Sequence, residues 1–200
     1  TGTYVTKKEL ESFLNAVPDD VVVFLDEAYF EFANYSMKDY PNGLDYLNKP
    51  NIIVSRSFSK AYGLAGLRIG YGVSSRESIG YMERVREPFN VNILAQAAAV
   101  AALEDVSFLN KTLSYIDKEK KYLYGVFKRM KLEYIPSATN FILLDTKKDC
   151  KTIFTKLLNE GVIVRDMKAW GLDTYIRVTI GTRAENSRFV EALKKVKDVL

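Results

Sequence analysis

Apolar positions along the chain follow two spacings in turn, one typical of buried strands and one typical of helices. Continuous apolar runs predict strands at 21–25, 52–54, 67–73, 141–144, 162–164 and 175–180. Spacings of three and four residues predict helices at 7–17, 75–86, 93–103, 109–130, 150–159 and 184–199. The first helix begins with a capping-box pattern, and the alanine-rich helix at 93–103 is expected to be buried on most sides.

The alternation of strands and helices predicts an α/β fold. Residues 1–105 are expected to hold part of a mostly parallel sheet, which is incomplete because three strands are few for such a layer. Residues 106–200 are expected to form a small α+β domain. The boundary falls near 104–112, where the alanine-rich helix gives way to a long amphipathic one.

Composition narrows the chemistry that the chain can perform. The 200 residues carry a net charge of +4, which is too weak to argue for a nucleic-acid or membrane partner. There is no histidine, so no metal site built on histidine and no Ser-His-Asp triad is expected. The single cysteine, Cys150, excludes an internal disulfide and favours the cytoplasm. The sequence contains no run of eighteen apolar residues, so no membrane-spanning helix is predicted from it.

Candidate site residues follow the predicted strands, where ligand sites of α/β proteins gather. Asp26 follows the first strand. It could be a carboxylate of a functional site, or it could only cap a helix or form a surface ion pair. After the second strand come Ser57, Ser59 and Lys60. The serines could bind an anion and Lys60 could act as a nucleophile, although composition alone, with 29 basic residues, favours an ordinary exposed loop lysine. Arg68 follows, beyond two glycines, and a guanidinium suits a phosphate.

The order of these motifs resembles a known family. Residues 26–29 (DEAY) and 55–71 (SRSFSKAYGLAGLRIGY) resemble fold-type I aminotransferases, which use pyridoxal phosphate. Within them the chain is most similar to the histidinol-phosphate aminotransferase branch. Further matching strings occur at 86–92, 136–141, 161–166 and 175–182. The resemblance covers essentially the whole chain and keeps the order of the family's motifs.

The resemblance implies a role for three residues near the cofactor ring. Lys60 is expected to form the Schiff base with pyridoxal phosphate and then to move the proton of the substrate. Asp26 is expected to face the pyridine nitrogen and keep it protonated. Tyr29 is expected to donate a hydrogen bond to the phenolic oxygen of the cofactor.

The resemblance also implies two anion contacts. Ser57, Ser59 and Arg68 are expected to hold the cofactor phosphate, with Arg68 as the fixed cation. Arg177 is expected to bind the α-carboxylate of an amino-acid substrate through a two-point contact. Outside the family context, Arg177 reads as a surface arginine at a strand end.

The function that the resemblance implies is amino transfer from histidinol phosphate to 2-oxoglutarate in histidine biosynthesis, by a homodimer. Another fold-type I enzyme remains an alternative, either an aromatic aminotransferase or an amino-acid-phosphate decarboxylase. Two alternatives without catalysis also remain. The basic residues between 111 and 131 could contact nucleic acid, although such a face usually only binds water. The chain could also serve as a dimerisation unit alone.

The sequence departs from the family at its beginning. Thr1 and Gly2 match the end of a family string whose cofactor-contacting asparagine lies just upstream. The N-terminal half of the family's large domain has no counterpart in these residues. We therefore expect a C-terminal fragment that has little or no activity by itself.

Overall fold

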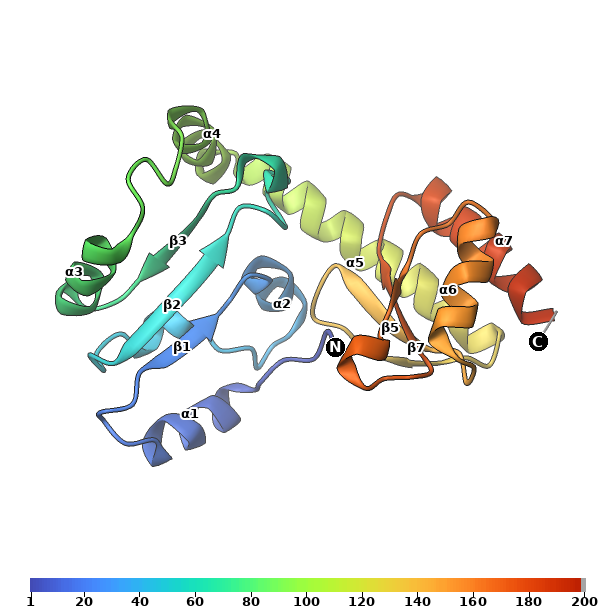
Figure 1. Ribbon diagram of the computed structural model, residues 1–200, viewed down its shortest axis with the longest axis horizontal. Helices are drawn as coiled ribbons and strands as arrows, with labels where there is room; N and C mark the ends of the chain where they lie inside the picture. The colour runs from blue at the N-terminus through green and yellow to red at the C-terminus, as the bar shows by residue number, and fades with distance from the viewer. Residues whose placement is uncertain (199–200) are drawn as a thin grey trace. The chain divides into compact units, whose positions relative to one another are not determined.

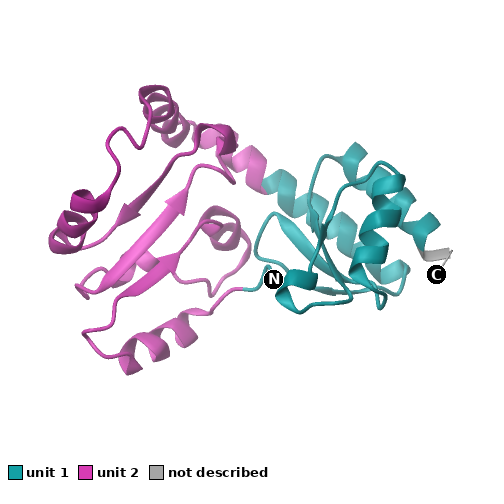
Figure 2. Cartoon of the chain, in the orientation of Figure 1, with its two compact units in different colours: residues 1–3, 114–200 teal, residues 4–113 magenta. Residues whose placement is uncertain are grey.

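Two compact units make up the computed structural model, which describes residues 1–198 (Figure 2). Unit 1 joins Thr1–Thr3 to Ser114–Leu200, and unit 2 comprises Tyr4–Leu113. The boundary between 113 and 114 falls within α5 (Val106–Arg129), so this long helix contributes to both units.

Unit 2 combines a three-stranded sheet with helices that precede, separate and follow its strands (Figure 1). The strands are β1 (Val23–Asp26), β2 (Ile52–Ser57) and β3 (Gly70–Val73). The α-helices are α1 (Lys7–Ala16), α2 (Phe30–Ser36), α3 (Arg76–Val85), α4 (Ile93–Glu104) and the first part of α5. Two short 3-10 helices are η1 (Gly43–Tyr46) and η2 (Ala65–Leu67).

The sheet of unit 2 is mixed, in the order β1-β2-β3. β1 and β2 are parallel, with Asp26 opposite Ser55, so their carboxyl ends lie side by side. β3 is antiparallel to β2, with Ser57 opposite Gly70. A Cβ atom at position 70 would lie 2.7 Å from the carbonyl oxygen of Arg56, which explains the glycine. The register therefore brings the beginnings of the two motifs, at 26–29 and 55–71, to the same end of the sheet.

The core of unit 2 lies between α1 and the sheet. Leu10 and Leu14 of α1 pack with Val23 of β1 and with Ile52 and Val54 of β2, and all five are at least nine-tenths buried. The capping box predicted for the start of α1 is present, so the helix begins where the sequence indicates.

Several apolar side chains of unit 2 are exposed, contrary to the predicted burial. In α4, Ile93 is 78% and Leu94 is 74% exposed, and only Ala95 and Ala99 are buried. The prediction that this helix is buried on most sides was wrong for the described residues. Phe24 of β1 is 56% exposed as well. An apolar sequence predicts that a helix or strand will be buried, but burial also requires other side chains that pack against it.

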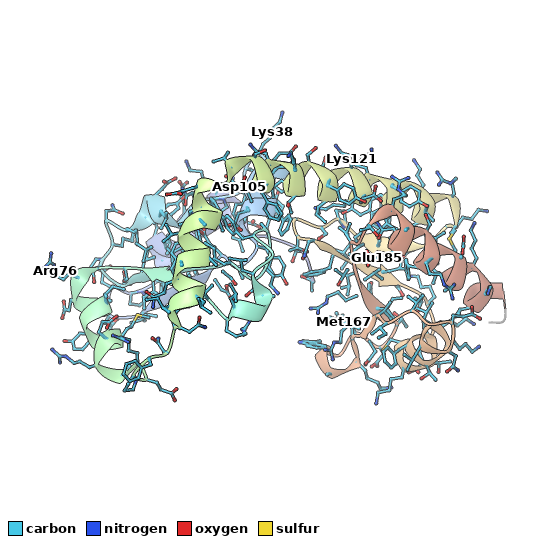
Figure 3. All side chains as sticks on the ribbon, turned by 90° about the horizontal axis from the view of Figure 1, so that it is seen from above. Lys38, Arg76, Asp105, Lys121, Met167 and Glu185 are labelled. Carbon is cyan, nitrogen blue, oxygen red and sulfur yellow. The ribbon has the colours of Figure 1, made fainter. Side chains whose placement is uncertain are left out.

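Asp105, labelled in Figure 3, separates α4 from α5. Its Oδ1 accepts the N–H of Phe108 at 2.9 Å, and its own N–H donates to the oxygen of Ala101 at 3.2 Å. The two helices meet at a bend of 76°. Among residues 1–198, no single helix is long and apolar enough to cross a membrane, while this bent pair passes by length and composition alone.

Unit 1 is built on a four-stranded antiparallel sheet in the order β4-β5-β7-β6 (Figure 1). The strands are β4 (Glu133–Ile135), β5 (Phe141–Asp145), β6 (Arg165–Asp166) and β7 (Tyr175–Thr179). The helices are the remainder of α5, α6 (Cys150–Asn159), the 3-10 helix η3 (Lys168–Trp170) and α7 (Arg183–Asp198). Glu185, labelled in Figure 3, accepts the N–H of Thr182 at 2.6 Å at the start of α7.

The core of unit 1 forms where α5, α6 and α7 cover the sheet. Phe127 of α5 is fully buried, and its ring lies against those of Tyr134 (5.8 Å between centroids) and Phe189 (6.3 Å). Ile153 and Leu157 of α6 join the same cluster. The helical spacing read from the sequence thus identifies the buried face of α5 correctly, since Leu123 and Phe127 are both buried.

Two strands of unit 1 differ from the predictions. The strand predicted at 162–164 is not one; β6 pairs only at Arg165–Asp166, because strand character depends on a partner as well as on side chains. β4 was not predicted, since three residues show no clear alternation. The predicted last helix is present, although its final residue, Val199, lies outside the described residues.

Candidate active site

The carboxyl ends of β1 and β2 bring the first candidate residues together in unit 2. Asp26 ends β1, and its Oδ1 accepts the N–H of Ala28 at 3.1 Å and the hydroxyl of Ser55 at 3.4 Å. The carboxylate is exposed, so a ligand can reach it. The parallel register that places Asp26 opposite Ser55 also brings it close to the turn after β2.

The turn after β2 collects hydroxyl and guanidinium groups. The Ser57 hydroxyl accepts the N–H of Ser59 at 3.0 Å, and the Ser59 hydroxyl accepts from Nη1 of Arg68 at 3.5 Å. Nη1 of Arg68 also donates to the carbonyl oxygen of Ala65 at 2.8 Å, which anchors the guanidinium. Two hydroxyls and one cation in a turn form a suitable environment for a phosphate.

Lys60 lies in the same turn and faces the start of α2. Its Nζ is 5.1 Å from the centroid of the Tyr29 ring, and both residues are half-buried. The turn is closed by the N–H of Gly63, which donates to the carbonyl oxygen of Lys60 at 3.1 Å. Gly63 has a φ of 71°, a conformation that favours glycine. The amine is therefore held beside a phenol by short local contacts.

A buried polar cluster underlies these residues, and the sequence analysis assigned it no role. Arg56 of β2 forms an ion pair with Glu27, which directly follows Asp26. Burial raises the pKa of the nearby Glu31 carboxyl, and it raises the pKa of Tyr40 to about 12. The alternation of side chains along a strand could have revealed this cluster. Arg56 stands between Ser55 and Ser57, so its side chain points to the opposite face of the sheet.

Arg177 belongs to unit 1, on β7, whereas the other six candidate residues belong to unit 2. Its Cζ is 4.9 Å from the centroid of the Phe141 ring, and its backbone is paired with that of Arg165 across β6 and β7. The register places these two arginines on the same face of the sheet. The sequence analysis missed Arg165, because the register of a two-residue strand cannot be read from sequence.

The chain is similar to known proteins over its whole length. Residues 1–193 match the family described as aminotransferase class I and II. The chain is 52% identical over 201 residues to histidinol-phosphate aminotransferase 2 of Carboxydothermus hydrogenoformans, covering 100% of this chain and 55% of that protein.

Two solved structures share the fold. One is histidinol-phosphate aminotransferase from Sinorhizobium meliloti in complex with pyridoxal-5'-phosphate, with a TM-score of 0.91 at 32% identity over 100% of this chain and 55% of that chain. The other is L-threonine-O-3-phosphate decarboxylase from Porphyromonas gingivalis, with a TM-score of 0.82 at 28% identity over 98% of this chain and 61% of that chain.

The chain spans about half the length of the relatives that it matches. The predicted α/β class is confirmed by the fold and by both solved structures. The predicted family resemblance is confirmed too, because the family match extends over nearly every residue. The chain belongs to the family of class I and II aminotransferases.

Proposed function

We propose that the protein catalyses pyridoxal-phosphate-dependent amino transfer from histidinol phosphate to 2-oxoglutarate, a step of histidine biosynthesis. One observation carries the proposal: Lys60 is held beside Tyr29, in the same turn as the Ser57, Ser59 and Arg68 group. The substrate follows from the 52% identity to a histidinol-phosphate aminotransferase.

The chemistry of the donor set fits the cofactor. Ser57, Ser59 and Arg68 supply two hydroxyls and a cation for the cofactor phosphate. Tyr29 supplies a hydroxyl for the phenolic oxygen on the cofactor ring. Asp26 supplies an exposed carboxylate that keeps a pyridine nitrogen protonated. When bound, the cofactor withdraws electrons from the Cα atom of the substrate, which makes that carbon acidic.

Lys60 supplies the base. We assign to it the covalent attachment of the cofactor and, once its Nζ is free, the removal of the proton from the substrate Cα. The cation–π contact with Tyr29, at 5.1 Å, keeps this amine on the side of the turn where the phenol lies. A general base must be held within reach of its proton, and the closed turn limits how far Lys60 can move.

Arg177 is our candidate for binding the α-carboxylate of an amino-acid-type substrate, which for the proposed pair of substrates means the carboxylate of 2-oxoglutarate or the phosphate that histidinol phosphate carries in its place. The Phe141 ring lies against its guanidinium and restricts its position. Arg165, opposite it, adds a second cation on the same face of the sheet. Two cations suit the two carboxylates of 2-oxoglutarate and the doubly charged phosphate of histidinol phosphate.

The wider assembly is also a proposal. We assign residues 1–105 to the C-terminal part of a larger cofactor-binding domain with a mostly parallel sheet, and residues 106–200 to a small domain. The parallel pairing of β1 with β2 supports the first assignment. The exposed apolar side chains of α4 support a homodimer, and the free, buried Cys150 suits the cytoplasm.

A second candidate function is decarboxylation of an amino acid phosphate. The 28% identity to L-threonine-O-3-phosphate decarboxylase favours it, and Lys60, Asp26 and Arg68 would serve either reaction. Product analysis separates the two. A decarboxylase releases carbon dioxide from its substrate, whereas a transaminase converts 2-oxoglutarate to glutamate.

Borohydride trapping tests the cofactor site. The protein is mixed with pyridoxal phosphate and reduced, and the labelled peptide is mapped by mass, both for residues 1–200 and for any longer natural product that contains them. We expect one label per chain, on Lys60. It should vanish in Lys60→Ala and persist in Lys38→Ala, a change at an exposed lysine of the same unit (Figure 3). Labels scattered over exposed lysines of the longer product would refute the proposal, whereas the same result on residues 1–200 alone would mean that the site needs residues outside this range.

A further inference from the structure

A buried ion pair lies on the face of the sheet away from the proposed cofactor residues. Nε and Nη2 of Arg56 donate to Oε2 of Glu27 at 3.0 and 2.8 Å, and the two side chains are 9% and 6% exposed. The other carboxylate oxygen, Oε1, accepts the N–H of Gly43 at 2.7 Å. Both charged groups are thus enclosed and hydrogen-bonded.

Arg56 makes two more contacts from the same position. Its Nη2 donates to Oδ1 of Asn42 at 2.7 Å, and its Cζ lies 3.4 Å from the centroid of the Phe30 ring. One guanidinium therefore joins β2 to the end of β1, to the first residue of α2 and to the loop before η1. Few side chains could join four segments, and a lysine could not supply the same fork.

The pair is adjacent in sequence to the residues that we assign to the cofactor. Glu27 follows Asp26, and its backbone N–H donates to the carbonyl oxygen of Ser55 at 2.9 Å. Arg56 stands directly before Ser57 on β2. Holding Glu27 to Arg56 therefore sets the separation between Asp26 and Ser57, which we place at opposite ends of the cofactor.

Stability alone is a poor explanation for this pair. A buried ion pair loses hydration on folding, and apolar side chains of similar volume often stabilise a protein as well or better. The surroundings are also closely fitted to it: a Cβ atom at Gly43 would lie 2.9 Å from Oε1 of Glu27. What the pair supplies beyond stability is directed geometry, since two guanidinium N–H groups converge on Oε2 of Glu27 while the N–H of Gly43 holds Oε1.

We infer that the Arg56–Glu27 pair is a positioning device. It sets the distance between the carboxylate of Asp26 and the residues around Ser57 that we assign to the cofactor phosphate. Neither member touches the cofactor in this inference; both act through their neighbours in the chain. The inference rests on the proposed function, because it assigns the two ends of the cofactor to those neighbours.

The test compares cofactor binding with folding in Arg56→Met, Arg56→Lys and Glu27→Gln. Pyridoxal phosphate affinity is titrated on folded protein, visible circular dichroism reports how the bound cofactor is oriented, and thermal unfolding reports stability. We expect the dissociation constant to rise about tenfold or more in Arg56→Met and Glu27→Gln, as for other residues that support a ligand shell. The dichroism of bound cofactor should change, and Arg56→Lys should recover affinity only in part.

Glu119→Gln is the matched control. Glu119 is a buried carboxyl of unit 1, 1% exposed, and it also pairs with an arginine, Arg183, but it has no part in the proposed cofactor site. Its replacement should leave the dissociation constant within about twofold of wild type. The double variant Arg56→Met/Glu27→Gln should bind no worse than the weaker single variant, because partners in one network are not additive.

Each outcome decides the matter. Variants that melt earlier but bind cofactor with unchanged affinity and dichroism would show that the pair is structural only. If Arg56→Met does not fold, the near-isosteric Glu27→Gln provides the same comparison. If the longer wild-type product takes no label on Lys60, the proposed function fails and takes this inference with it. If wild type is labelled and the variants bind as it does, the inference alone fails.

Discussion

Replacing Glu119 with alanine removes the carboxylate that joins α5 to the start of α7, next to the turn at residues 180–182. Its two oxygens accept three hydrogen bonds from Arg183, at 2.8 to 3.1 Å, and one from Asn186 at 3.0 Å. Glu119 is 1% exposed, whereas the Arg183 side chain is 49% exposed. The same turn directly follows β7, the strand that carries Arg177.

The exposure of the partners sets the size of the loss. Breaking a fully buried pair destabilises by about 3–5 kcal/mol, and breaking an exposed one by about 0.2–1 kcal/mol. Arg183 can turn to water, but the Nδ2 group of the buried Asn186 loses one acceptor and keeps its bond to the oxygen of Gly181. We therefore expect Glu119→Ala to lower the free energy of unfolding by about 2–3 kcal/mol.

Urea unfolding monitored by tyrosine fluorescence and circular dichroism measures this difference. Asp117→Ala is the control, since Asp117 lies on the same helix and pairs with the exposed Lys121, and it should lose no more than about 0.5 kcal/mol. Equal losses in the two variants, or a loss below about 1 kcal/mol for Glu119→Ala, would refute the reasoning about burial.

The effect of pH gives an independent check on the same pair. Hydrogen bonds from Arg183 lower the pKa of the Glu119 carboxyl, so the unfolded chain takes up this proton at a higher pH than the folded one. The stabilisation is complete above the unfolded pKa and is lost as the pH falls through the folded pKa. The difference between wild type and Glu119→Gln should therefore shrink in acid; a difference independent of pH would contradict the pairing.

Two further predictions concern stability. Burial lowers the pKa of Lys120, whose Nζ donates to the carbonyl oxygen of Ser137 at 2.8 Å, so its charged form is penalised in the folded state. Between the lowered and the ordinary pKa, wild type should gain stability relative to Lys120→Met as the pH rises. Urea unfolding at a series of alkaline pH values measures this difference, and a difference that does not change with pH would contradict the prediction. Gly70→Ala should lose about 1–3 kcal/mol in urea unfolding, because the new Cβ would lie 2.7 Å from the oxygen of Arg56. Gly66→Ala, with open space at its Cβ, should lose less than half as much, and equal losses would exclude steric overlap as the cause.

Much of the fold could be predicted from local pattern. Helical spacing predicted the helices α1, α3, α4, α5, α6 and α7, because which face of a helix is apolar is written in consecutive residues. The order of the motifs at 26–29 and 55–71 indicated the family, which the match over residues 1–193 bears out. The roles of Lys60 and Asp26 remain predictions that the labelling experiment tests.

The sequence by itself therefore determined the types of most elements, the order of the motifs and the family. Only the tertiary structure decided which distant residues meet: Arg56 with Glu27, and Arg165 with Arg177. It also decided that β3 runs antiparallel and that Ile93 is exposed. The physical reason is range, since spacing along the chain governs a helix or a turn, whereas strand register and burial depend on partners that are far away in sequence.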